Sequence, residues 1–215
     1  MASSRTQMIL FRHGETDWSR QGKHTGRTDV PLNDAGHHAA ALLLPVADTL
    51  ARGLVRTSPL LRAKQTCQAA GMADVAQEDP DLMEWDYGQY EGLTTTELRR
   101  TEPDWELFRH GCPGGESVAD VAARADAFIG RVRNPADTES ETETETDDAV
   151  VFAHGHLLRV LAARWIKQPP ELGRHLRLET GRFSLLGYKR EDPVIHIWNA
   201  PIAALLELDL TATSA

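Results

Sequence analysis

The chain has 215 residues, of which 41% are hydrophobic and 26% charged, with a formal net charge of −9 and two cysteines. That length suits one domain with a substantial core. No stretch approaches the roughly 20 apolar residues that are needed to cross a bilayer. The chain is acidic and has no stripe of basic residues that would bind nucleic acid. Two cysteines are too few for a disulfide framework or a zinc site, and residues 1–7 hold no apolar leader segment, so we expect a cytoplasmic protein.

Strand-like and helix-like segments alternate along the chain, which predicts an α/β fold of three layers, with a mostly parallel central sheet and helices on both faces. The first half of the chain predicts a strand from Ile9 that Gly14 breaks, a polar loop at 17–32, a helix capped by Asn33 or Asp34 and running to about Leu50, a strand at 54–57 and a helix at 60–70. A loop at 81–92 and short helices from Thr95 and around Trp105 follow. The second half predicts a helix from Ser117 to about Val132, a strand at Val150, a helix from His156 to about Lys167, and a terminal pair of strands at 183–188 and 194–198.

An acidic tract precedes the strand at Val150. Seven acidic residues and no basic one lie between Pro135 and Ala149, in a pattern that alternates Glu with Thr. Charge runs of this kind stay solvated. We therefore expect a single domain over 1–215 with a disordered acidic loop at about 134–148. A regulatory phosphorylation site at Ser140 or Thr142 is the alternative interpretation of this tract.

Two apolar strands each end in a histidine followed by a glycine, at His13-Gly14 and at His154-Gly155. The carboxyl ends of parallel strands meet at one edge of a sheet, where ligands bind. Arginine presents a planar fork of donors that suits phosphate, and histidine serves as nucleophile or proton carrier near neutral pH. Together with Arg12 these strand ends predict one shared anion site, although either histidine alone could equally be a buried structural residue.

A third strand, at 54–57, ends at Ser58-Pro59 and continues as a helix. This break places Arg62 in the first turn of that helix, above the same edge of the sheet. The N-terminus of a helix already favours anions. The pattern therefore adds a second arginine to the predicted anion site.

The motifs resemble the histidine phosphatase, or phosphoglycerate-mutase-like, superfamily (branch 1). Matching blocks occur in the expected order over most of the chain: Arg12-His13-Gly14-Glu15-Thr16, residues 26–32, residues 58–63, residues 82–92, and Gly114 to Ser117 with Ala153-His154-Gly155-His156. So many ordered blocks are far more specific than one short motif.

The resemblance implies catalysis through a phosphohistidine, with no metal and no other cofactor. His13 would attack phosphorus, and Arg12 and Arg62 would clamp the phosphoryl oxygens. His154 would donate to the same oxygens. In a site of this type the electrostatic stabilisation of the transition state falls to these side chains.

Glu84 is the general acid and base that the resemblance implies: it would protonate the leaving alkoxide and then activate water. Asp81, Asp86 and Glu91 lie close to it in the sequence, and only the resemblance selects Glu84 among them. We expect Glu91 to hold the shape of this loop.

Within the superfamily, the chain is most similar to the fungal sedoheptulose-1,7-bisphosphatase type and to related bacterial acid phosphatases. The partner implied is a small phosphorylated metabolite, such as a sugar phosphate or bisphosphate. Residues implied to bind the substrate or its phosphate are Thr16, Ser19, His24, Thr25, Gly26 and Gly155, and Glu116 and Ser117 would also face the substrate. Candidates for a second phosphate pocket are Lys23, Arg27 and Arg109.

Two alternatives remain. A mutase would pass the phosphoryl group to a second hydroxyl instead of water, but the segment after the acid-bearing loop is short, and Ser19 stands where mutases usually have asparagine. A silent relative that only binds a phosphorylated ligand would normally lack the nucleophile or the acid, and both His13 and Glu84 are present. The sequence leaves open the physiological substrate and the oligomeric state, a homo-oligomer included.

Overall fold

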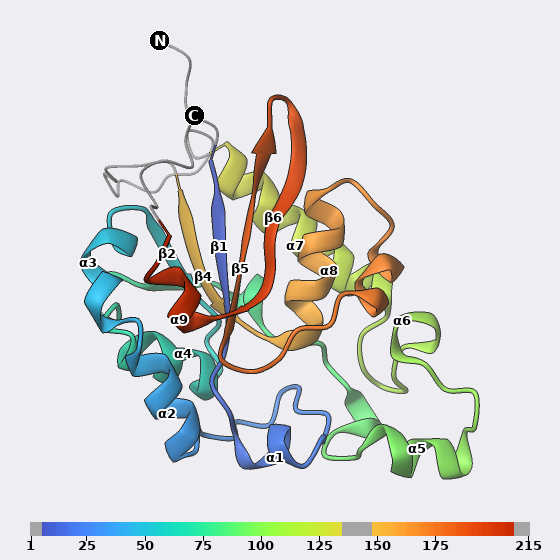
Figure 1. Ribbon diagram of the computed structural model, residues 1–215. Helices are drawn as coiled ribbons and strands as arrows, with labels where there is room; N and C mark the ends of the chain where they lie inside the picture. The colour runs from blue at the N-terminus through green and yellow to red at the C-terminus, as the bar shows by residue number, and fades with distance from the viewer. Residues whose placement is uncertain (1–5, 135–147, 209–215) are drawn as a thin grey trace.

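The computed structural model describes residues 6–134 and 148–208. A six-stranded sheet in the order β3-β2-β4-β1-β5-β6 lies between two layers of helices (Figure 1). Its strands are β1 (Met8–Arg12), β2 (Leu54–Thr57), β3 (Gln77–Glu78), β4 (Ala149–Ala153), β5 (Arg182–Lys189) and β6 (Asp192–Pro201). The first four strands are parallel to one another, and β5 and β6 add an antiparallel pair. The predicted α/β fold is confirmed as a mixed sheet.

β4 is apolar along its whole length and β1 is apolar up to Arg12 at its end, because helices cover both faces of the sheet. Along β1, Met8 and Leu10 pack into one core, while Ile9 and Phe11 pack into the other. The first core contains residues of α7 (Val118–Arg133) and α8 (Gly155–Trp165), and the second contains residues of α3 (Ala47–Leu50), α4 (Leu61–Ala69) and α9 (Ile202–Leu205). Side chains that alternate between the two cores fix the register of β1.

The single helix expected from Asn33 to about Leu50 is wrong. Asn33 does cap a helix, since its side chain accepts from the Gly36 N–H at 2.9 Å, but that helix, α2, is Asp34–Ala41. A short 3₁₀ helix (Leu44–Val46) and α3 follow it. Pro45 explains the break, because proline has no N–H to donate to the carbonyl of Ala41 and its ring clashes there.

Other short elements also depart from the predicted pattern. A one-turn helix, α1 (Asp17–Arg20), lies inside the expected loop at 17–32, and neither β3 nor α9 was predicted. The terminal strand pair, the helix capped by Ser117 and the short helices α5 (Thr95–Thr101) and α6 (Leu107–His110) are confirmed. In Figure 1, α1, α5 and α6 lie beyond the carboxyl ends of the parallel strands. The acidic tract at 135–147, with Ser140 and Thr142, lies outside the described residues.

We expect Leu161→Ala to destabilise the fold strongly. Leu161 of α8 is fully buried in the core, and removing such a side chain costs about 2–5 kcal/mol of unfolding free energy. Leu44→Ala is the matched control, because Leu44 is 55% exposed and surface changes stay within about 0.5 kcal/mol. Urea denaturation measures both, and equal losses in the two variants would contradict this packing.

Candidate active site

The pairing of β1 with β4 brings the two strand-end histidines together. Arg12 is in register with Ala153, and the next residue on each strand is a histidine. The His13 N–H donates to the Ala153 carbonyl at 2.9 Å, and the rings of His13 and His154 lie 5.2 Å apart between centroids. Both side chains are buried. Two residues separated by 141 positions in the chain therefore share one site.

The His13 ring is held in a single tautomer. Its Nδ1 lies 2.8 Å from the carbonyl oxygen of Gly14, which can only accept, so Nδ1 carries the proton. Nε2 is then left with a free lone pair. Burial lowers the pKa of His13 well below its usual value of 6.5, and the positive charges of Arg62 and Arg12 lower it further. A neutral imidazole with a free Nε2 is the form required for nucleophilic attack.

A close contact between two glycines fixes the turn after His13. A Cβ atom on Gly14 would lie 2.6 Å from the carbonyl oxygen of Gly36 in α2. The Gly14 N–H donates to the Thr66 hydroxyl of α4 at 3.0 Å. The backbone that orients the His13 ring is therefore anchored to two helices at once.

His154 caps α8 and makes a hydrogen bond that the sequence analysis missed. Its Nε2 lies 2.7 Å from the hydroxyl of Ser58, which is itself fully buried at the end of β2. Its Nδ1 is buried with no hydrogen-bond partner. Burial, and then the charge of Arg62, lower the pKa of His154 well below 6.5, so that this ring is also neutral at pH 7. From the sequence, Ser58 was identified only as part of the Ser58-Pro59 break that ends the strand.

Arg62 is a fully buried cation held by carbonyl oxygens alone. Its guanidinium donates to the carbonyls of Thr25 (2.8 Å), Gly26 (2.9 Å) and Thr28 (3.1 Å), and it makes no carboxylate ion pair within the described residues. Glu91 secures the same loop by accepting from the N–H groups of Gly26 and Thr28 at 2.8 and 3.1 Å. The positive charge of Arg62 thus remains available to an anion.

Arg12 lies under the first turn of α8. Its Nη1 donates to the carbonyl of Leu178. A Cβ atom on Gly155 would lie 3.1 Å from the Nε and Cζ atoms of Arg12, so this helix position leaves room only for a hydrogen beside the guanidinium. Gly155 therefore contacts Arg12 directly.

Three buried nitrogens of these residues have no hydrogen-bond partner: Nε of Arg12, Nε of Arg62 and Nδ1 of His154. An unmade hydrogen bond to a buried polar group costs about 1–3 kcal/mol, so native proteins rarely leave such groups unpaired. Both guanidinium nitrogens are obligatory donors. A bound anion with several acceptor oxygens would satisfy these nitrogens together.

The carboxylate of Glu84 is buried at the N-terminus of α8. One oxygen accepts from the N–H groups of Trp85 and Leu157, both at 2.9 Å, and the other accepts from the N–H of His156 at 3.1 Å. The N–H groups in the first turn of a helix have no partners within the helix, and so they favour a negative charge at this position. These bonds place an acid beside the strand-end histidines, as the resemblance implied.

Arg124 of α7 holds the loop that carries Glu84, a role that the sequence analysis did not find. Its guanidinium donates to the carbonyls of Asp81 (2.7 Å), Met83 (2.6 Å) and Glu84 (3.2 Å). It also pairs with both carboxylate oxygens of Glu116, at 2.7 and 2.9 Å. Glu116, which we expected to face the substrate, therefore serves the loop through this pair.

The hydroxyls of Thr16 and Ser19 form a capping box at the start of α1. Ser19 N–H donates to the Thr16 hydroxyl at 3.0 Å, and Thr16 N–H donates to the Ser19 hydroxyl at 2.9 Å. His24 is buried further along the same loop, with Nε2 3.3 Å from the Thr95 hydroxyl. Burial lowers the pKa of His24 to about 4, so the ring is neutral at pH 7.

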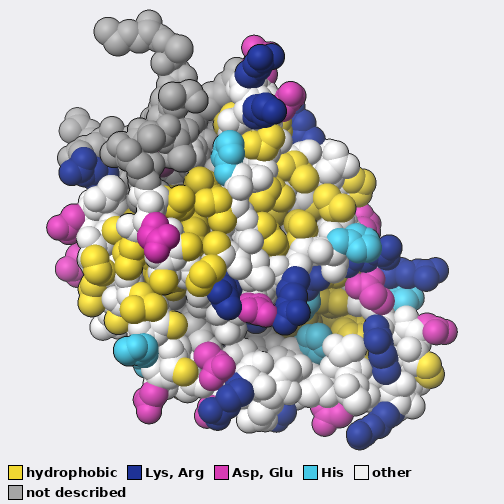
Figure 2. Space-filling view, viewed as in Figure 1, with side chains coloured by type: hydrophobic (Ala, Val, Ile, Leu, Met, Phe, Trp, Pro, Cys, Tyr) yellow, Lys and Arg dark blue, Asp and Glu magenta, His cyan; other side chains and the backbone are white. Residues whose placement is uncertain are grey.

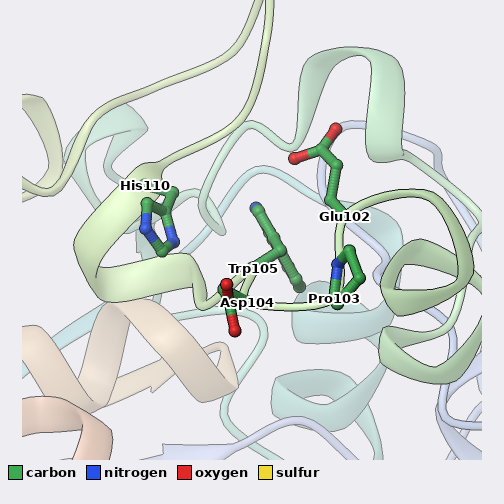
Figure 3. A pocket seen from close by; sticks show the side chains of 5 residues that line it. All are labelled: Glu102, Pro103, Asp104, Trp105 and His110. Carbon is green, nitrogen blue, oxygen red and sulfur yellow. The ribbon is translucent and has the colours of Figure 1, made fainter.

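An open depression of about 240 Å³ lies on the outer side of this region (Figure 3). It is lined by Glu102, Pro103, Asp104, Trp105 and His110. Its two carboxylates would repel a phosphate. This depression is therefore a poor site for a phosphorylated substrate.

Paired strand-end histidines, two arginines and a buried acid at the carboxyl edge of an α/β sheet define a phosphoryl-transfer enzyme. The family model described as histidine phosphatase superfamily (branch 1) matches residues 8–201, and the chain belongs to this superfamily. Within the described residues, no helix has the length and apolarity to cross a bilayer, and no cluster of three or more potential metal ligands occurs.

Known relatives agree with this assignment. An acid phosphatase of Mycobacterium tuberculosis is 37% identical over 185 residues, which are 85% of this chain and 87% of the relative. Sedoheptulose 1,7-bisphosphatase of Saccharomyces cerevisiae is 34% identical over 192 residues, 77% of this chain and 69% of the relative. The solved structure of an open reading frame from Mycobacterium tuberculosis superposes with a TM-score of 0.82 at 34% identity, covering 92% of this chain and 98% of that chain. The predicted enzyme class, a phosphatase, is confirmed.

Mutases are also related to the chain. A 2,3-bisphosphoglycerate-dependent phosphoglycerate mutase of Azorhizobium caulinodans is 31% identical over 191 residues, 81% of this chain and 88% of the relative.

We expect acid to destabilise the protein through its buried neutral histidines. The unfolded chain binds a proton on His24 below pH 6.5, whereas the folded protein does so only near pH 4, so the stability that this residue contributes is lost as the pH falls through this window. Between pH 7.5 and 5.5 the loss is about 1 kcal/mol for this one residue. Urea unfolding at both pH values should show that His24→Gln reduces the pH dependence by this amount; equal pH dependence in the two proteins would contradict the neutral state.

Proposed function

We propose that the protein hydrolyses phosphomonoesters through a phosphohistidine on Nε2 of His13, without a metal ion. The observation that carries this proposal is the single tautomer of His13, whose free Nε2 lies beside two arginines that no carboxylate neutralises in the described part of the chain. The orphaned nitrogens of Arg12, Arg62 and His154 supply donors for the phosphoryl oxygens.

In the first step, the lone pair of Nε2 attacks phosphorus, the N–P bond forms and the ester P–O bond breaks. Glu84 enters this step protonated, gives its proton to the leaving alkoxide and becomes the carboxylate that three backbone N–H groups stabilise. Arg12 and Arg62 offset the negative charge on the equatorial oxygens. Ser58 donates to Nε2 of His154, so that Nδ1 of His154 carries a proton toward the same oxygens.

In the second step, Glu84 accepts a proton from water, and the resulting hydroxide attacks the phosphorus. The N–P bond breaks, its electron pair returns to Nε2, and inorganic phosphate leaves. His13 and Glu84 are then restored to their starting forms. The same acid thus serves as a base when the direction of proton transfer is reversed.

The substrate class that we propose is a small phosphorylated metabolite, a sugar phosphate or a bisphosphate such as sedoheptulose 1,7-bisphosphate. The yeast relative that carries this substrate in its name supports the choice, and the acid phosphatase relative supports hydrolysis. Transfer to a second hydroxyl, as in the related mutases, is the alternative. We further propose that the chain acts in the cytoplasm as a single domain, with Thr16, Ser19, His24, Thr25, Gly26 and Gly155 around the substrate.

The test uses the wild-type protein and His13→Ala in EDTA, against a panel of sugar bisphosphates, sugar monophosphates, phosphoglycerates and p-nitrophenyl phosphate. We expect phosphate release by the wild type and a loss of at least about 10³-fold in His13→Ala, since removal of a covalent nucleophile abolishes its pathway. Acid-labile, base-stable ³²P on the quenched wild type would identify phosphohistidine. An isomerised phosphate ester without phosphate release would instead show a mutase, and unimpaired release by His13→Ala would overturn the mechanism.

Arg124→Met tests whether Arg124 positions Glu84 by holding the loop that carries it. Loss of the guanidinium should loosen the acid-bearing loop and lower kcat about 10- to 100-fold for an alkyl phosphate, whose leaving group needs a proton. The loss should be smaller for p-nitrophenyl phosphate, because nitrophenolate leaves without one. Arg164→Met is the matched control, since Arg164 pairs with Asp126 on the surface of α8. Equal losses with both substrates would contradict a role in positioning the acid.

A further inference from the structure

A second cavity, of about 130 Å³, lies between α5, α6 and α8. It adjoins the reaction centre along two segments of chain. His24 lines the cavity, and the carbonyls of the next two residues hold Arg62. His156 also lines it, and its backbone N–H holds Glu84. A molecule bound at the phosphoryl site could therefore extend into this cavity.

Two arginines without acidic partners line the cavity. Arg99 of α5 donates through Nε to the carbonyl of Trp105 at 3.2 Å. Arg159 of α8 donates to the carbonyls of Gly173 (2.8 Å) and Arg174 (2.9 Å). Neither forms an ion pair with a carboxylate in the described part of the chain. In Figure 2, basic, acidic and histidine side chains lie interspersed at the lower right, beside α5 and α6.

The other polar groups of the cavity define the ligand further. Burial lowers the pKa of His24 to about 4 and the pKa of His156 well below 6.5, so both rings are neutral at pH 7. The two arginines supply the positive charge, which the single carboxylate of Glu106 offsets only in part. Glu106 also lines the cavity, and its Oε2 is buried with no hydrogen-bond partner. A carboxylate oxygen can only accept hydrogen bonds, so a hydroxyl group of a ligand would be a suitable donor to it.

The basic residues that the sequence analysis proposed for a second phosphate are less suited to bind one than Arg99 and Arg159. Arg27 lies 3.6 Å from both Asp86 and Glu116, which offset its charge. The ammonium of Lys23 lies 5.5 Å from the ring centre of Trp18. Arg109 lines neither of the two cavities described here.

We propose that the cavity binds a second anionic group of the substrate, with Arg99 and Arg159 as donors and Glu106 accepting from a hydroxyl beside that group. The inference rests on the proposed phosphatase function and narrows its substrates to hydroxylated molecules with two anionic ends. A cavity needs only about 10–15 Å³ of space to hold one water molecule, so 130 Å³ accommodates a group as large as a phosphate or a carboxylate.

Arg99→Glu tests the proposal through ratios of kcat/KM between matched substrates. The ratio of kcat/KM for fructose 1,6-bisphosphate to that for the fructose monophosphates measures recognition of a second phosphate. The ratio for 3-phosphoglycerate to glycerol 3-phosphate measures recognition of a carboxylate. We expect the wild type to prefer the doubly anionic member of one pair, and Arg99→Glu to reduce that ratio about 10- to 100-fold, the effect of losing a hydrogen bond to a charged group. Arg100→Glu is the control and should leave both ratios unchanged, because Arg100 is exposed on the same helix, as Arg99 is, but does not line the cavity.

Binding to the His13→Ala protein separates this proposal from the proposed function, because it requires no turnover. We expect Arg99→Glu in that background to weaken binding of fructose 1,6-bisphosphate or of 3-phosphoglycerate at least about tenfold by calorimetry. Unchanged affinity for both ligands, or unchanged ratios in the kinetic assay, would overturn the assignment of the cavity. A wild type that forms no phosphohistidine, while still showing this Arg99 dependence in binding, would overturn the proposed function alone.

Discussion

The burial of Arg62 without a carboxylate partner is the constraint on which the site depends. Desolvating a cation is costly unless other polar groups surround it, and here three carbonyls of the loop after α1 do so. The loop must therefore close over α4 in one conformation. Burial lowers the pKa of both His13 and His154, and the charge of Arg62 lowers it further, so that both rings are neutral. Arg62 thus fixes the shape of the loop after α1 and adds to the effect of burial on the histidines.

The N-terminus of α8 supports the site in three ways within one turn. His154 caps the helix, Gly155 makes room for Arg12, and the N–H groups of the next two residues hold Glu84. Residues of a rigid helix position catalytic groups more precisely than a loop does. Arg124 completes this arrangement from α7 by holding the carbonyls of the loop that carries Glu84. The acid is therefore fixed both through its carboxylate and through its backbone.

Most of the fold could be predicted because its long elements satisfy strong local patterns. The two central strands are apolar except for Arg12 at the end of β1, and α7 begins at the expected Ser117 cap. The failures occur where a local signal was weak or was overlooked. Pro45 ends α2 one turn ahead of its own position, as its chemistry requires. The short β3 and α9 carry little periodicity of their own and depend on neighbouring elements for their formation.

The sequence by itself determined which residues are the candidates for the chemistry, since the proposed nucleophile, arginines and acid lie in motifs whose residue types and order are specific. It also determined that both histidines follow strands, which is a local property. Only the tertiary structure decided which atoms face one another. The tautomer of His13, the bond between Ser58 and His154, and the clamp of Arg124 join residues from separate elements. The same holds for the second cavity, which Arg99 of α5 and Arg159 of α8 line together with Trp105 and Phe108, an arrangement that no local pattern encodes.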